Sequence, residues 1–111
     1  LPMQRISTPK KLQKPIYFER AELGLILATY STRVASGEWR DYAIDHLPGC
    51  ATFSIFRHTH ETPLFTVEKR QRYSNERPQF TLRDSNKTLC KASSMQEITR
   101  YFNRLPQLIT G

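Results

Sequence analysis

The densest group of side chains able to bind a ligand is basic and lies in the second half of the chain. The run Lys69-Arg70-Gln71-Arg72-Tyr73 is followed by further cations at Arg77, Arg83, Lys87 and Lys91. Lys and Arg bind phosphates and carboxylates, and the rings of Tyr73 and Phe80 offer faces on which bases stack. The pattern predicts a polyanion-binding surface. Its expected residues are Lys69, Arg70, Arg72, Arg77 and Arg83. The alternative is a charged hairpin that keeps an edge strand from pairing wrongly.

A second unusual stretch is Glu38-Trp39-Arg40-Asp41-Tyr42, in which two acids, an Arg and two aromatic residues follow one another. Trp and Arg dominate the binding energy of protein interfaces, so one interpretation makes Trp39 and Arg40 a surface anchor for a partner protein. The other interpretation is structural: Trp39 covers the edge of the core, and Arg40 pairs with a neighbouring acid or with a helix-end carbonyl. A helix-to-strand junction favours the structural interpretation. Trp39 and Arg40 nevertheless remain candidate partner-binding residues.

Two histidines, His58 and His60, are two positions apart and would share one face of a strand. With a thiolate from Cys50 or Cys90 they could form a zinc site. None of these residues has the C-x-x-C or H-x-x-x-H spacing that is typical of zinc sites. We therefore expect no metal site, and two cysteines are too few for a disulfide scaffold.

A catalytic site is not indicated either. A cysteine beside a histidine could act as a nucleophile, and Glu38, Asp41 and Asp45 could supply acid–base chemistry. No local motif surrounds either cysteine, and the carboxylates are equally well explained as solvated or ion-paired. The 4 glycines are scattered, which argues against a Gly-rich phosphate loop. We expect no enzymatic activity and no cofactor.

Length and composition indicate one folded domain. The 111 residues are 38% hydrophobic and 11% aromatic, which is too apolar for a disordered chain. No apolar run is long enough to span a membrane. The net charge of +7 comes mainly from residues 1–20 and residues 57–91. Basic regions of this kind favour acidic protein surfaces, anionic lipid or RNA as partners.

Residues 1–15 form a segment of different character. They contain Pro2, Pro9 and Pro15 and the run Lys10-Lys11-Leu12-Gln13-Lys14. Proline breaks helices and removes hydrogen-bond donors, and no core-forming pattern is present. We expect an extended basic arm over residues 1–15 and a single domain over residues 16–111. Along a partner protein, the arm would bind through Lys10, Lys11 and Lys14.

Helical patterns lie near both ends of the domain. Apolar residues at helical spacing predict a first helix over residues 20–36, with Glu19 as N-cap and Gly37 as the left-handed residue that ends it. Ser94 and Glu97 form an S-x-x-E capping box, which predicts the start of a second helix. Pro106 stops that helix.

The segment between the helices reads as short strands separated by turns. Alternating apolar residues and turn signals at Pro48-Gly49, Thr62-Pro63, residues 74–78 and residues 84–86 predict five strands. Connections this short favour a mainly antiparallel meander. Neither helix can bury its apolar stripe alone, so both are expected on one face of the sheet. The predicted fold is α+β, in the order helix, five strands, helix.

The nonapeptide Gly37-Glu38-Trp39-Arg40-Asp41-Tyr42-Ala43-Ile44-Asp45 resembles the signature of a small alphaproteobacterial family of unknown function, number twenty-seven ninety-four among such families. Phe53-Ser54-Ile55-Phe56-Arg57 and Val67-Glu68-Lys69 resemble its central hairpin. The second half departs, because Ala92-Ser93 stands where the family has an Arg-Gly pair. The resemblance implies a lineage, with a mitochondrial protein of bacterial descent as one outcome. It brings no activity.

These observations lead to one hypothesis and two alternatives. The hypothesis is a non-catalytic binding module, an accessory subunit of a larger protein assembly such as a respiratory-chain complex. The expected compartment is the matrix side of the mitochondrion or an alphaproteobacterial cytoplasm. One alternative is an RNA-binding or ribosome-associated protein that uses the basic hairpin; the other is a small enzyme. RNA and anionic lipid are further expected contacts. DNA is not expected, because the sequence has no helix-turn-helix signal.

Overall fold

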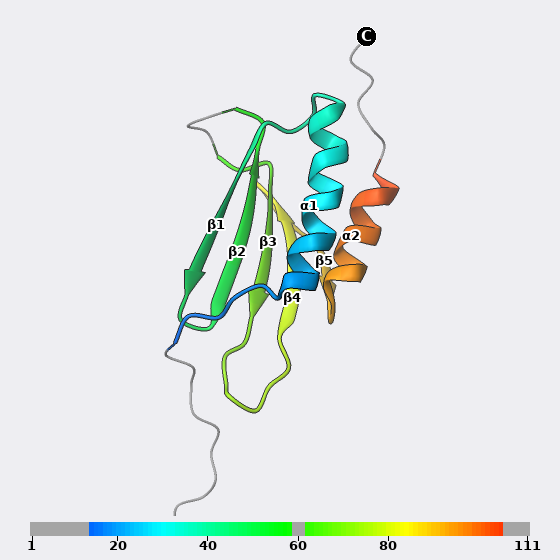
Figure 1. Cartoon of the computed structure of the whole chain (residues 1–111). Coiled ribbons are helices and arrows are strands. Elements are labelled where there is room, and N and C mark those ends of the chain that lie inside the picture. Colours follow the sequence, from blue (N-terminus) through cyan, green and yellow to red (C-terminus); the bar gives the residue numbers. More distant parts are fainter. Residues whose placement is uncertain (1–13, 59–61, 106–111) are drawn as a thin grey trace, which may run out of the picture.

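A computed structural model of the chain describes residues 14–58 and 62–105. It has the predicted element order (Figure 1): α1 (Arg20–Ala35), β1 (Asp41–Leu47), β2 (Cys50–Phe56), β3 (Phe65–Arg70), β4 (Gln79–Asp84), β5 (Thr88–Ala92) and α2 (Met95–Arg104). The five strands form one sheet in the order β1-β2-β3-β4-β5, and all neighbours are antiparallel. The α+β meander predicted from the sequence is confirmed.

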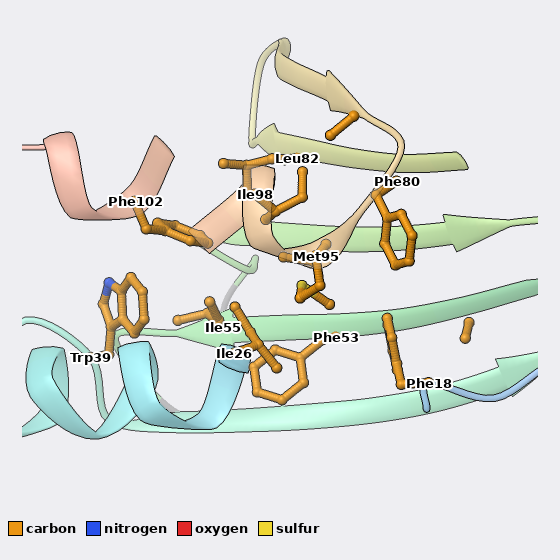
Figure 2. Close-up of a cluster of buried hydrophobic side chains, with 13 residues drawn as sticks. Phe18, Ile26, Trp39, Phe53, Ile55, Phe80, Leu82, Met95, Ile98 and Phe102 are labelled. Carbon is orange, nitrogen blue, oxygen red and sulfur yellow. The ribbon is translucent and has the colours of Figure 1, made fainter. Parts of the chain in front are cut away.

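Both helices cover the same face of the sheet, as Figure 1 shows. The core lies between these two layers, and Figure 2 shows its side chains. The strands contribute alternate residues to it, such as Phe53, Ile55, Val67 and Leu82, because successive side chains of a strand point to opposite faces. The helices cover the side of the core opposite the sheet, mainly with Ile26, Ile98 and Phe102, which are fully buried.

Each helix begins at the residue that the sequence predicts. Glu19 is the N-cap of α1, and the carboxylate of Glu22 accepts a hydrogen bond from the Glu19 backbone N–H at 2.7 Å. Ser94 caps α2 by accepting a hydrogen bond from the Glu97 backbone N–H, and Glu97 in turn accepts from the Ser93 N–H at 2.9 Å. These side chains satisfy backbone donors that have no partner within the helix.

The end of α1 is tied to the start of β1 and to the end of α2. The buried guanidinium of Arg33 pairs with Glu38 at 2.9 Å and donates hydrogen bonds to the backbone carbonyls of Phe102 and Leu105. The hydroxyl of Ser36 donates to the other oxygen of Glu38 at 2.7 Å. Arg33 therefore places a positive charge against the last carbonyls of α2, at the helix end where a positive charge is favourable.

Trp39 continues this junction into the core. Its side chain is only 3% exposed, and its ring lies 5.1 Å from that of Phe102 and 6.0 Å from that of Phe65. Gly37 has a φ of 83°, which allows the chain to turn sharply between α1 and Trp39. The structure therefore supports the structural interpretation of Trp39. The pairing expected of Arg40 is not found among the described residues, because Arg33 and not Arg40 binds Glu38 and the helix-end carbonyls. The hypothesis of Trp39 as a surface anchor is wrong for this conformation, because its ring is already covered.

The other candidate partner-binding residues are Arg40 and the lysines of the basic arm. Arg40 is exposed, and its backbone N–H donates to the Phe56 carbonyl at 2.9 Å, where the pairing of β1 with β2 begins. Lys10 and Lys11 lie outside the described residues. Lys14 is exposed, but its carbonyl accepts a hydrogen bond from the Gly49 N–H, and Pro15 forms a bridge with Pro48. Lys14 and Pro15 are therefore attached to the β1–β2 turn.

We expect Arg33→Met to destabilise the fold by about 3 kcal/mol, since removing one partner leaves Glu38 as a buried uncompensated charge. Urea unfolding followed by circular dichroism measures the loss, and Arg40→Met is the matched control at an exposed position, with a change within about 0.5 kcal/mol. The double variant Arg33→Met with Glu38→Leu should recover most of the stability. Equal losses for Arg33→Met and Arg40→Met would contradict this account.

Candidate functional site

The face of the sheet that the helices leave uncovered is polar and carries a charge gradient. Cross-strand partners on this face form rows, one of which runs through Asp45, Thr52, Glu68, Thr81 and Lys91. The gradient follows from these positions. At one edge β1 contributes acids, whereas β3, β4 and β5 contribute cations, and hydroxyl groups lie on the strands between the two edges. A polyanion is therefore attracted to one half of this face and repelled by the other.

A hollow of about 760 Å³ lies at the basic side of this open face. The ends of β3, β4 and β5, the loop of residues 71–78 and the first turn of α2 form its walls. Its cations are Arg70, Arg72, Arg77, Arg83 and Lys91, all of which are exposed. Its carboxylates are Glu68, Glu76 and Glu97. We call this site the basic hollow.

The carboxylates of the basic hollow have hydrogen-bond partners within the described part of the domain, whereas most of its cations do not. Glu68 pairs with Arg70 at 3.0 Å, whereas Glu76 accepts from the Arg72 backbone N–H at 3.2 Å and Glu97 accepts from the Ser93 N–H. Each carboxylate of the basic hollow thus has a partner within the domain. Among the described residues, the side chains of the other four cations form no hydrogen bond or ion pair; they are Arg72, Arg77, Arg83 and Lys91. The hollow therefore presents an excess of uncompensated positive charge.

Four of the five predicted polyanion-binding residues, namely Arg70, Arg72, Arg77 and Arg83, come together in the basic hollow. The fifth does not, and its prediction is corrected. Lys69 points to the helix-covered face and is only 4% exposed. Its ammonium group pairs with Glu22 at 2.8 Å and donates to the Tyr17 carbonyl at 2.9 Å. Adjacent strand residues point to opposite faces, so Lys69 and Arg70 cannot share a ligand.

The polar groups outside the hollow show little sign of reactive chemistry. Both cysteines are free thiols, and burial raises the pKa of the Cys50 thiol, with the nearby Glu68 carboxylate adding to the effect. A raised pKa lowers the fraction of nucleophilic thiolate. Within residues 14–58 and 62–105, no three His, Cys, Asp or Glu side chains are grouped as metal ligands. No helix in the described part of the chain is long and apolar enough to cross a membrane.

Comparison with known families matches residues 16–98 to DUF2794, described as a protein of unknown function. The chain belongs to this family. No curated protein and no solved structure matches the chain. The matched residues of the DUF2794 domain include all five strands and the first turn of α2, so the described residues that line the basic hollow all lie within the family region.

Two features of the DUF2794 domain were not predicted from sequence. The three carboxylates of the basic hollow were missed, because their proximity to the arginines depends on sheet register and on the path of the β3–β4 loop. The buried role of Arg33 was missed although its position indicates it, because Arg33 follows Ile26 by seven residues and Tyr30 by three and so shares the apolar face of the helix. The five-residue separation from Glu38 was a second signal.

We expect Lys69→Met to lower the stability of the domain by about 3 kcal/mol, because Glu22 loses its partner in a largely buried pair. Binding of a polyanion such as heparin should be unchanged, since Lys69 lies on the opposite face from the basic hollow. Chemical unfolding and heparin-column elution measure the two effects. Arg83→Met is the matched comparison, and it should elute earlier from heparin while its stability stays unchanged. Earlier heparin elution of the Lys69 variant alone would show that our assignment of the two residues to opposite faces is wrong.

Proposed function

We propose that this DUF2794 domain is a non-catalytic binding module, an accessory subunit of a larger protein assembly, and that the basic hollow binds an acidic surface of a partner protein. The observation that carries the proposal is the unequal satisfaction of charges in the hollow. Four cations have no internal partner, while all three carboxylates do. Clustered cations repel one another, so a binding partner that supplies carboxylates gains charge-assisted hydrogen bonds.

Arginine dominates the hollow, which suits the recognition of carboxylates. The planar guanidinium forms two parallel hydrogen bonds to a carboxylate and is more weakly hydrated than an ammonium group. Arg72, Arg77 and Arg83 are also exposed, so a partner reaches them without unfolding the domain. The volume of the hollow accommodates several side chains of a partner rather than a single ion.

A protein partner fits this site better than RNA does. The carboxylates of Glu68, Glu76 and Glu97 interrupt the positive charge of the hollow. The acids of a partner protein can be spaced to avoid them, whereas a continuous phosphate backbone cannot. Among the described residues, no aromatic side chain lines the hollow, whereas proteins that bind single strands usually stack bases on aromatic rings. Tyr73, which is 38% exposed in the neighbouring loop, is the one feature that favours RNA. RNA binding is therefore the alternative outcome of the test.

The proposal extends to compartment and activity. The resemblance of the nonapeptide at Gly37 to an alphaproteobacterial signature supports the mitochondrial matrix or an alphaproteobacterial cytoplasm as the compartment, with a respiratory-chain complex as host. We propose no catalytic role for the hollow. Its arginines are permanently charged, and its carboxylates are held by internal hydrogen bonds, so it offers a binding surface rather than a proton-transfer group.

The test is the native size of the particle that contains this protein, measured by size-exclusion chromatography of extracts of its source cells. We expect elution far above 13.0 kDa, with or without RNase treatment. Charge reversal at Arg77→Glu and Arg83→Glu together should release the protein, with about tenfold weaker association. Arg20→Glu, on α1 and away from the hollow, is the matched control.

Three outcomes would count against the proposal. Elution at the monomer mass would indicate a free-standing protein. Collapse of the particle on RNase treatment would favour RNA, for which four phosphate contacts predict an affinity loss of about 50-fold between 50 and 200 mM salt. Release by Arg40→Glu but not by the variants of the hollow would move the interface to the start of β1.

A further inference from the structure

The sheet has two edges, and they differ in the sign of their charge. Within the described residues, β1 is paired only with β2, and β5 is paired only with β4. Each edge strand therefore has a row of backbone N–H and C=O groups that an added strand can bind. Which edge accepts a strand depends on the side chains beside it.

The edge of β1 is poorly suited to an acidic partner. Asp41 and Asp45 lie on it, and a carboxylate opposite them would be repelled. Asp41 also accepts a hydrogen bond from the Tyr42 backbone N–H at 2.8 Å, which occupies a donor at this strand. These features are typical of edge strands that are protected against pairing.

The edge of β5 lies beside the basic hollow. Lys91 pairs with Thr81 across the β4–β5 ladder, and both residues line the hollow, so Lys91 faces the open side of the sheet. Residues 91–93 all border the hollow, which is therefore adjacent to the end of β5. Arg83 stands on the neighbouring strand β4 and on the same face. An acidic segment is thus drawn to β5 and away from β1.

We propose that an extended acidic segment of the partner protein adds to β5 (Thr88–Ala92) as a sixth strand and directs alternate carboxylates into the basic hollow. The proposal rests on the function proposed above and names the form in which the acidic partner binds. Neighbouring strands lie about 4.8 Å apart, so a carboxylate opposite Lys91 is within reach of its ammonium group. The β4–β5 ladder shifts register between Leu82 and Arg83, so the added strand alternates regularly opposite Cys90–Ala92, and Arg83, which pairs with Thr88, lies beyond the shift.

The other face of the added strand has different requirements. Cys90 and Ala92 are the residues of β5 that pair with the core residues Leu82 and Phe80, so they face the helices. Side chains opposite them lie beside small groups near α2, and apolar residues fit there. Glu97 lies near Ser93 and repels a carboxylate at that end. The expected ligand alternates acidic and apolar residues, with its acids centred on Lys91.

The experiment measures binding of a synthetic peptide, fluorescein-Glu-Val-Glu-Val-Glu-Val-Glu-amide, to the full chain by fluorescence anisotropy. A shuffled peptide of equal composition and an alternating peptide with N-methylated backbone nitrogens are the comparison ligands. We expect the alternating peptide to bind best and N-methylation to abolish binding, because methyl groups block strand pairing. Hydrogen exchange should slow at residues 88–92, which side-chain contact alone would not cause.

Variants locate the site. Lys91→Glu should weaken the alternating peptide about fivefold, since an attraction becomes a repulsion. Lys87→Glu, an exposed cation in the β4–β5 turn that does not line the hollow, should change it by less than about twofold. Binding that survives N-methylation but is lost on reversal of Arg77 and Arg83 would overturn strand addition and leave the acidic-partner function standing. If neither the alternating nor the shuffled peptide binds, both proposals fail, and slower exchange at residues 41–47 instead of 88–92 would transfer the site to β1.

Discussion

The guanidinium of Arg33 is the point at which three separate parts of the chain meet. It neutralises Glu38, which leads into β1, and it binds the last carbonyls of α2. A buried cation is unfavourable unless it is paired and hydrogen-bonded. The angle of α1, the entry of Trp39 into the core and the position of the C-terminal helix are therefore set together. The apolar contact of Trp39 with Phe102 follows from this arrangement.

This one-sided architecture explains where a binding site can form. Both helices and nearly all large apolar side chains lie on the same side of the sheet, so the main apolar core does not include the open face. That face is free to carry charges whose repulsion would not be tolerated in a core. The mixture of Ser and Thr in the middle strands keeps it polar, and the basic hollow occupies the side that the β3–β4 loop borders.

The sequence predicted the fold well because its signals were local. Ser94 and Glu97 marked the start of α2, Gly37 marked the end of α1, and turn residues separated strands whose apolar residues alternate. The site was predicted only in part. Lys69 and Arg70 are equivalent in a charge count, yet one is buried with Glu22 and the other faces the hollow. Which face a strand residue takes depends on the register and on where the helices pack, and neither is set by neighbouring residues alone.

The order of the strands has a consequence for how the domain is assembled. Each strand pairs with the one that precedes it in the chain, so the sheet grows through short-range contacts, which favour rapid folding. The bond from Arg33 to the Phe102 carbonyl spans 69 residues. During synthesis on the ribosome, the meander is complete in the emerging chain before α2 is available. The helix layer, and with it the burial of Arg33, Glu38 and Trp39, can therefore close only when the last residues of the domain have emerged.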